Sequence, residues 1–336
     1  MASICQRDNF YGEYAQMQPR TNWLPIAGLL MAMVLWASSF IALKLAFQGF
    51  HPMVVIFGRM FIASICFLFL IPSLKGNSYQ KGDLKYILFM VVCEPCLYFL
   101  FEAKALENTT ASQAGMITAM LPLLVAISAG ALLKEVVTKK TYAGFILAIS
   151  GACLLSLGGT TSEAAPHPAL GNFYEFVAMV CAAGYTIALK KLTERYNPFF
   201  LTAVQAFAGS VFYLPMVFLS STAFPGSFAM VPFLSIIYLG VFVTVGAYGF
   251  YNYGVSRIPA SQASAFVNLI PVFTVFLGWA ILGEKFTLMQ YLASALVFVG
   301  VFISQDRAAQ SEKPKILEQG EPVYSPVHTD DSSNRV

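Results

Sequence analysis

Ten long apolar stretches follow one another along this chain of 336 residues, and short polar breaks separate them. A helix needs about 20 mostly apolar residues to cross the core of a bilayer, and each stretch comes close to that length. The runs are also too long and too evenly apolar for membrane β-strands, which alternate in polarity. The pattern therefore predicts an all-α integral membrane protein with ten transmembrane helices. These helices are predicted at residues 23–47, 53–70, 84–101, 111–133, 142–157, 173–189, 199–219, 231–253, 260–282 and 288–303.

The second half of the chain repeats the first. Ala-Ser-Gln-Ala occurs at residues 111–114 and again at 260–263, which is 149 positions later. Ile-Ala-Leu-Lys occurs at 41–44 and again at 187–190, an offset of 146. Further matches at the longer offset are Pro122 with Pro271, Glu135 with Glu284 and Gly151 with Gly300. A membrane chain that contains two copies of one unit is typical of a secondary transporter.

Lysine and arginine gather on one side of the predicted helices. The side that holds both termini carries 16 of the 20 basic residues, the other side carries three, and Arg59 falls within a helix. Because basic residues favour the cytoplasmic side, we expect both termini in the cytoplasm and a multi-pass protein of the cell membrane, plasma or inner. Each copy contains five helices, an odd number, so the two repeats must be inverted relative to one another.

The pattern also divides the chain into five parts. We expect the first five-helix repeat at residues 23–158, an outer linker at 159–169 and the second repeat at 170–304. A short polar tail, residues 1–22, precedes them and a longer tail, residues 305–336, follows. The C-terminal tail is rich in Glu, Pro, Ser and Asp, so we expect it to be disordered in the cytoplasm.

Composition supports a lipid environment. Charged residues make up 11% of the chain, whereas soluble domains contain about 25%. So few charges cannot cover the surface of a soluble protein, and most of the surface must face lipid. The net charge of +3 is small and scattered along the chain, which argues against a nucleic-acid partner.

Several short motifs, present in both copies, resemble a known family. In the first copy they are Trp-Ala-Ser-Ser-Phe at 36–40, Ala-Ser-Gln-Ala at 111–114 and Leu-Pro at 121–122, and in the second Ala-Ser-Gln-Ala at 260–263, Ile-Pro at 270–271 and Gly-Glu at 283–284. Together they resemble the ten-helix EamA-type branch of the drug/metabolite transporter superfamily, over residues 23 to 304. The resemblance implies a membrane transporter with a central cavity between the copies, which moves small metabolites or amino acids, often outward. The second copy departs from the pattern, because Gln205 aligns with Arg59 and Ala-Ala-Gly at 182–184 replaces the tryptophan motif.

Glu94 is the most informative side chain of the predicted helices. It lies near the middle of the third helix, roughly 15 Å deep at 1.5 Å per residue, and its counterpart in the second copy is Val243. An ionisable group at that depth is costly, so it usually faces a cavity or a partner. One interpretation is a carboxylate that binds a substrate amine or carries a proton. The alternative is a structural ion pair with Arg59, which lies nearer the outer surface.

Other candidates surround this position. Glu102 lies two turns beyond Glu94 and is either a water-contacting charge of an outer vestibule or a gate or substrate contact. Tyr98 lies one turn from Glu94 and shares its face, and Tyr248 in the eighth helix is a further cavity candidate. Trp36 lies in the middle of a helix instead of at the membrane interface, so it is either a cavity wall or a buried packing residue.

Asn268 is the last candidate for the cavity. It lies just before Pro271, near the middle of the ninth predicted helix. Its counterpart in the first copy is Ala119, so the polar side chain is not a repeated feature of the scaffold.

These residues favour a secondary active transporter over an enzyme or a channel. All three histidines lie outside the predicted helices and no aspartate lies within one, so we expect no catalytic centre, metal or cofactor. The expected substrate is a small neutral, zwitterionic or cationic metabolite such as an amino acid, which is exported by alternating access, and protons are the candidate coupling ion. The alternative is an importer or antiporter of sugar phosphates or nucleotide sugars. Such anions call for several basic residues in the cavity, and Arg59 alone lies deep.

Overall fold

The computed structural model describes residues 23–70, 77–132, 138–159, 161–219 and 229–304. Within these ranges nine helical segments are long and apolar enough to cross a membrane, and Leu288–Ile303 adds a shorter apolar helix. The predicted all-α fold with ten membrane helices is confirmed. The two predicted tails and Glu135 lie outside the described residues.

Each repeat consists of five spans. In the first repeat these are α2 (Trp23–Phe47), α3 (Pro52–Leu70), α4–η2–α5 (Asp83–Val91, Val92–Leu97 and Tyr98–Asn108), α6–η3–α7 (Ala111–Ile117, Thr118–Met120 and Leu121–Leu132) and α8 (Lys139–Leu157). In the second they are α9 (Pro168–Leu192), α10 (Pro198–Leu219), α11–η4–α12 (Met230–Tyr238, Leu239–Ala247 and Tyr248–Arg257), α13–η5–α14 (Ala260–Ala265, Phe266–Leu269 and Ile270–Leu282) and α15 (Leu288–Ser304).

The third and fourth spans of each repeat are interrupted at matching places. The third and eighth spans contain π-helical segments, η2 and η4, and the fourth and ninth contain 3-10 turns, η3 and η5. Each 3-10 turn ends directly before an Ile-Pro or Leu-Pro pair, because a proline nitrogen cannot donate to the preceding turn. In η2 the proline is Pro95, and the residue before it, Glu94, leaves the helical conformation with φ −150° and ψ 119°. These interruptions lie near the middle of their spans, where they free backbone groups for other partners.

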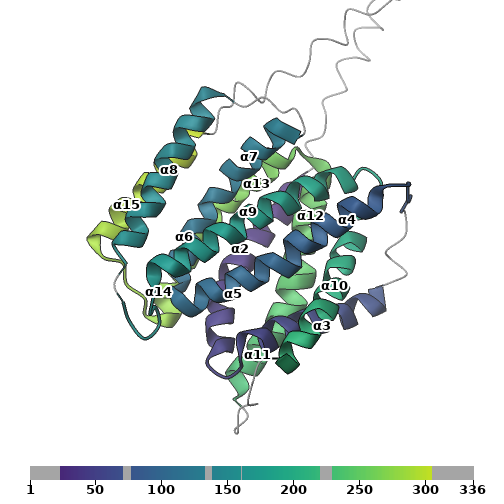
Figure 1. The fold of residues 1–336 in the computed structure, drawn as a ribbon, viewed down its shortest axis with the longest axis horizontal. Coiled ribbons are helices and arrows are strands. Elements are labelled where there is room, and N and C mark those ends of the chain that lie inside the picture. The colour runs from purple at the N-terminus through teal and green to yellow at the C-terminus, as the bar shows by residue number, and fades with distance from the viewer. Residues whose placement is uncertain (1–22, 71–76, 133–137, 160, 220–228, 305–336) are drawn as a thin grey trace, which may run out of the picture.

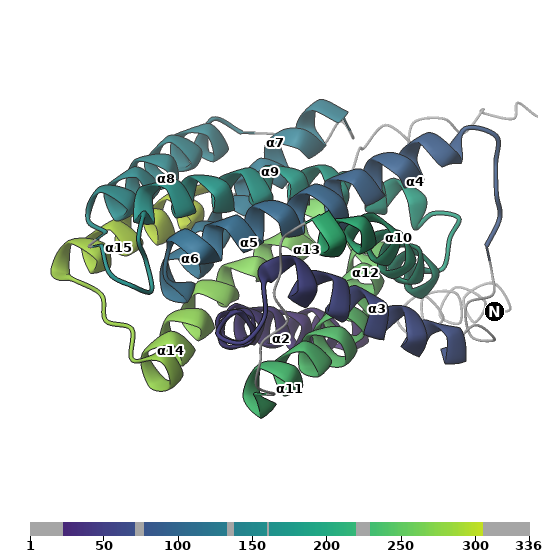
Figure 2. The same cartoon turned by 60° about the horizontal axis from the view of Figure 1, so that its bottom comes forward.

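Equivalent spans pack on one another across the two repeats. α3 packs on α10, α8 packs on α15, and the fourth span packs on the ninth through contacts of α6 with α14 and of α7 with α13, while α2 packs on α11 and α12 as α9 packs on α4 and α5. Figures 1 and 2 show α8 and α15 side by side at one edge of the bundle, and α5 beside α9 at its centre.

The contacts between α3 and α10 show that these equivalent helices run in opposite directions. Met60, in the middle of α3, lies against Gly209, in the middle of α10. Further along α3, Ala63 and Phe67 pack with Ala203 and Ala206, which come earlier in α10. A two-fold axis that relates antiparallel helices is perpendicular to them, so it lies in the plane of the membrane. The predicted inversion of the repeats is confirmed.

The outermost pair, α8 and α15, repeats the same relationship through glycine. A Cβ added at Gly151 would lie 2.7 Å from the backbone nitrogen of Val297, and one at Gly300 would lie 2.6 Å from that of Ala148. The two contacts are images of each other at the offset of 149. Small residues let membrane helices approach closely, and Gly144, Ala148 and Gly151 of α8 thus pack against α15 inside the protein.

Candidate functional site

A cavity lies between the two repeats, and the space that atoms do not fill, in the cavity and in the adjoining solvent together, is about 480 Å³. Its lining comes from α2, α3, η2, α5, α9 and α12, together with the helices around η3 and η5. Most of the site residues predicted from the sequence line it, namely Trp36, Arg59, Glu94, Tyr98, Glu102 and Tyr248. The structure thus brings together polar side chains that are far apart in the sequence.

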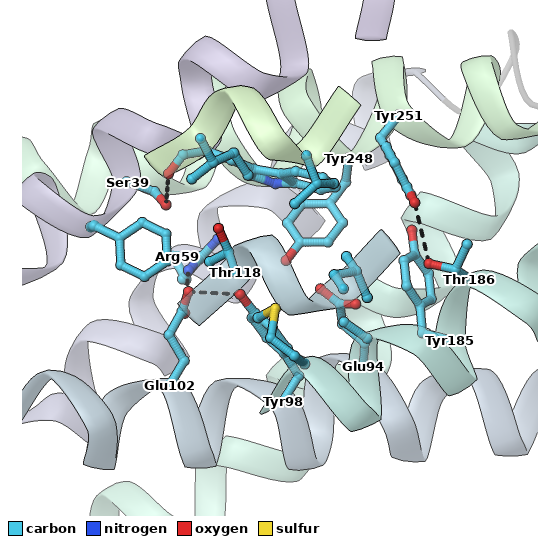
Figure 3. A pocket seen from close by; sticks show the side chains of 17 residues that line it. Ser39, Arg59, Glu94, Tyr98, Glu102, Thr118, Tyr185, Thr186, Tyr248 and Tyr251 are labelled. Atoms are coloured by element: carbon cyan, nitrogen blue, oxygen red, sulfur yellow. Dashed lines mark hydrogen bonds and ion pairs between the residues drawn. The ribbon is translucent and has the colours of Figure 1, made fainter. Parts of the chain in front are cut away.

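Glu94 reaches the cavity from the interrupted segment η2. Its side chain is buried, at 3% exposed, and Figure 3 shows its carboxylate pointing into the space between Tyr248 and Tyr185. The Tyr248 hydroxyl faces this carboxylate (Figure 3). The backbone carbonyl of Glu94, which the interruption frees, accepts a hydrogen bond of 3.2 Å from Gln205 Nε2. The local break in the helix therefore fixes the position of the carboxylate.

Arg59 pairs with Glu102 and not with Glu94. The guanidinium Nη1 lies 3.8 Å from Glu102 Oε2, its Nε donates to Thr244 Oγ1 at 3.2 Å, and its Cζ lies 4.2 Å above the Phe99 ring. The Tyr98 hydroxyl donates to the other oxygen of Glu102 at 3.0 Å. Glu102 is only 4% exposed, so it belongs to a buried cluster instead of a water-contacting vestibule.

Aromatic rings form one wall of the cavity. The Trp36 ring lies 5.1 Å from that of Tyr248 and 4.8 Å from that of Tyr251. Trp36 Nε1 is buried, and no described residue accepts its hydrogen bond. This N–H can therefore donate to a bound molecule, while the tyrosine rings contact the apolar part of that molecule.

A second polar network supports this wall from behind. The Tyr185 hydroxyl donates to Asn252 Oδ1, and Asn252 Nδ2 donates to Thr202 Oγ1 at 2.9 Å and to Gln205 Oε1 at 3.3 Å. Gln205, which takes the place of Arg59 in the second repeat, thus connects this network to Glu94. Tyr185, Thr202 and Gln205 were not predicted as site residues, although each is a polar residue inside a predicted helix.

Two further polar residues lie near the cavity without lining it. Asn268, a predicted candidate, lies between the lining residues Val267 and Ile270, and neither its Nδ2 nor its Oδ1 has a hydrogen-bond partner among the described residues. Glu175 in α9 was not predicted. It is fully buried, and both of its carboxylate oxygens lack a hydrogen-bond partner in the described part of the chain. Its position inside a predicted helix was the signal that could have identified it.

Polar contacts join the repeats at both ends of the bundle. At the linker end, Glu284 accepts hydrogen bonds from the backbone N–H groups of Ala111 and Ser112 at 2.9 and 2.8 Å, which caps the start of α6. At the other end, Arg195 Nη1 lies 3.0 Å from Asp83 Oδ1. These contacts hold the two repeats together on either side of the cavity.

Comparison with known proteins identifies the family. The model of the EamA-like transporter family matches residues 23–157 and again residues 169–304. The chain belongs to this family. The resemblance noted in the sequence is confirmed, and so is membership of a group of membrane-spanning transporters of small molecules.

Individual EamA proteins are similar along most of their length. An uncharacterized transporter of Bacillus subtilis (strain 168), YetK, is 28% identical over 84% of this chain and 87% of its own length. A Streptantibioticus cattleyicolor protein named "Probable terminal-alkyne amino-acid exporter" is 25% identical over 83% of this chain and 92% of its own. A crystal structure with a TM-score of 0.62 and 17% identity covers 84% of this chain and 96% of its own, and it supports the same fold.

Proposed function

We propose that this transporter exports a small amino compound, either an amino acid or a related neutral, zwitterionic or cationic metabolite, by alternating access between its inverted repeats. The supporting observation is the position of Glu94, a carboxylate that points into a cavity walled by aromatic rings. A carboxylate attracts an ammonium group, and the faces of aromatic rings attract cations as well. Both features favour a substrate that carries a protonated amine.

An amino acid also carries a carboxylate, and the same cavity offers donors for it. Arg59 is the only basic residue among the described residues that line the cavity, and the free N–H of Trp36 lies on another side. Guanidinium groups bind carboxylates through paired hydrogen bonds. A zwitterion that spans from Glu94 toward Arg59 would use both charges of the site.

The alternative substrates, sugar phosphates and nucleotide sugars, find less support. These anions carry at least two negative charges, whereas the described residues that line the cavity include a single guanidinium and two glutamates. The Streptantibioticus cattleyicolor relative, by its name, exports an amino acid, which supports both the substrate class and the direction.

The test is a transport screen with the full chain in proteoliposomes, using amino acids, amines and sugar phosphates, with and without a pH gradient. We expect amino compounds to be transported and Glu94→Gln to lose binding of them, because the amide keeps the shape but not the charge. Glu107→Gln is the matched control, since Glu107 is an exposed glutamate two and a half turns further along α5 than Tyr98. Transport of sugar phosphates alone, or unchanged binding by Glu94→Gln, would refute the proposal.

A further inference from the structure

Glu175 is a buried carboxyl group that the proposed binding site does not use. It lies seven residues after the start of α9 at Pro168, which places it roughly 10 Å from the linker end of the helix at 1.5 Å per residue. It continues the face of α9 that lines the cavity, since Met179, Ala182 and Thr186 follow it at helical spacing. Glu175 therefore lies just beyond the linker end of the cavity.

The surroundings of Glu175 are acidic and not basic. Glu102 and Tyr98, both on α5, are the titratable groups that interact with it. Among the other elements that pack on this part of α9, the segments α6, η3 and α7 have no ionisable side chain in their described residues. The charged residues of α8, Lys139 and Lys140, lie at the far end of that helix.

Charges at this end of the cavity do not balance if every acid is ionised. Glu94, Glu102 and Glu175 interact in series, and Arg59 is the one guanidinium among them, already paired with Glu102. The described residues contain no group that could hold a metal ion. A buried carboxylate without a hydrogen-bond donor or a counter-charge is very unfavourable, so the group takes up a proton instead.

We propose that Glu175 carries a proton: it is neutral while its end of the cavity is closed, and it releases the proton to water when that end opens. The step is a simple transfer from the carboxyl O–H to a water molecule at the linker end. After that end has closed, a proton from water at the opposite end of the cavity restores the neutral acid, so that each cycle moves one proton across the membrane. The contacts that hold this end closed begin one turn earlier on α9. There, Asn172 accepts from Thr109 Oγ1 at 3.0 Å and donates to Gln113 Oε1 at 3.1 Å. Separation of these contacts would admit water to Glu175 directly.

The coupling of this proton to export rests on the proposed transport function, but the protonation itself can be measured without a substrate. Infrared spectroscopy of the purified full-length protein at neutral pH detects the carbonyl stretch of a protonated carboxyl group. We expect Glu175→Gln to remove one such group and Glu107→Gln to remove none. If Glu175→Gln cannot be purified in folded form, Glu175→Asp must shift the band, because it keeps the carboxyl group in a different position. An unchanged band in either Glu175 variant would overturn the proposal.

Coupling is tested in proteoliposomes, with an equimolar mixture of amino acids as the probe. Each coupled proton contributes about tenfold to the accumulation ratio per unit of pH gradient, because one pH unit corresponds to about 1.36 kcal/mol. We therefore expect the accumulation ratio of Glu175→Gln to be about tenfold lower than that of the native protein for each unit of pH gradient. This variant should still bind the amino compounds that Glu94→Gln no longer binds. Undiminished pH-driven accumulation would overturn the coupling role. If no amino compound binds to the native protein, the proposed function fails, while the infrared result still decides the state of Glu175.

Discussion

Ser64 and Ser210 are counterparts in the two repeats, and their hydroxyl oxygens lie 2.9 Å apart. Their separation of 146 positions equals the offset between the early parts of the two copies. Two equivalent residues in contact must lie beside the pseudo-two-fold axis. Alternating access exchanges the conformations of the two inverted repeats. If i and j are residues of the first copy, the distance from i to the counterpart of j then becomes the distance from j to the counterpart of i. For a residue and its own counterpart this distance stays the same.

We therefore expect a cross-link at this position to leave transport intact. The pair Ser64→Cys and Ser210→Cys, in a chain whose native cysteines are replaced, should form a disulfide in the presence and absence of substrate. The control pair is Thr109→Cys with Asn172→Cys, which joins residues that are not counterparts. We expect oxidation of the control pair to stop transport and reduction to restore it. If the Ser64–Ser210 cross-link stops transport as well, the two repeats do not exchange conformations about this axis.

The distribution of basic residues predicts that both termini lie in the cytoplasm. Five spans, an odd number, lie between the linker and the C-terminal end. The C-terminal end and the linker should therefore lie on opposite sides of the membrane. Reporter fusions after Ser304 and at Pro166 measure this directly. Reports from the same side at both positions would contradict the arrangement of ten spans.

The ion pair between Arg59 and Glu102 predicts a pattern of instability. Arg59→Gln leaves Glu102 buried without its counter-charge, so we expect a loss of about 3–5 kcal/mol in stability. The double variant, Arg59→Gln with Glu102→Gln, removes both charges and should recover part of that loss. Thermal unfolding in detergent measures all three proteins. A double variant that is less stable than Arg59→Gln alone would contradict this account, because it would show that partners other than Arg59 stabilise the Glu102 carboxylate.

The close approach of α8 and α15 makes Gly300 sensitive to a single added methyl group. Its Cβ would lie 2.7 Å from the carbonyl oxygen of Gly144, and neither backbone can move without the other, so Gly300→Ala should cost about 1–3 kcal/mol through overpacking. Gly28 in α2 is the control, since its Cβ would meet Phe250 at ordinary distances of 3.6 Å and more. Gly28→Ala should be neutral or stabilising, because alanine favours helices more than glycine does. Equal melting temperatures for the two variants would contradict this account of the packing.

The number and place of the spans could be predicted because contact with lipid demands long apolar runs. The predicted ends of the spans were less accurate where the protein buries a polar or charged side chain. The third span was predicted to end at residue 101 and in fact continues to Asn108, because Glu102 is neutralised by Arg59 and does not need water. The sixth begins at Pro168 and not at residue 173, since Asn172 finds partners on neighbouring helices.

The sequence predicted more of the residues of the candidate site than of the contacts between them. Depth within a helix identified Glu94, and the absence of a counterpart distinguished it from scaffold residues. The pairing of Arg59 with Glu102 depends on how α3 and α5 approach each other across the bundle, which a local pattern does not encode. Glu175 lies close to the predicted start of its helix, where a side chain is expected to contact water, and yet it is fully buried.

The replacement of Glu94 by Val243 in the second repeat has an energetic consequence. If the two copies were identical, a two-fold rotation would relate the inward-open and outward-open forms, which would then have the same free energy and be equally populated. A charge contributed by one copy alone removes that degeneracy, because the two forms then hydrate the carboxylate to different extents. The repeated backbone thus gives the two forms similar free energies, and one unmatched side chain determines which form is more stable.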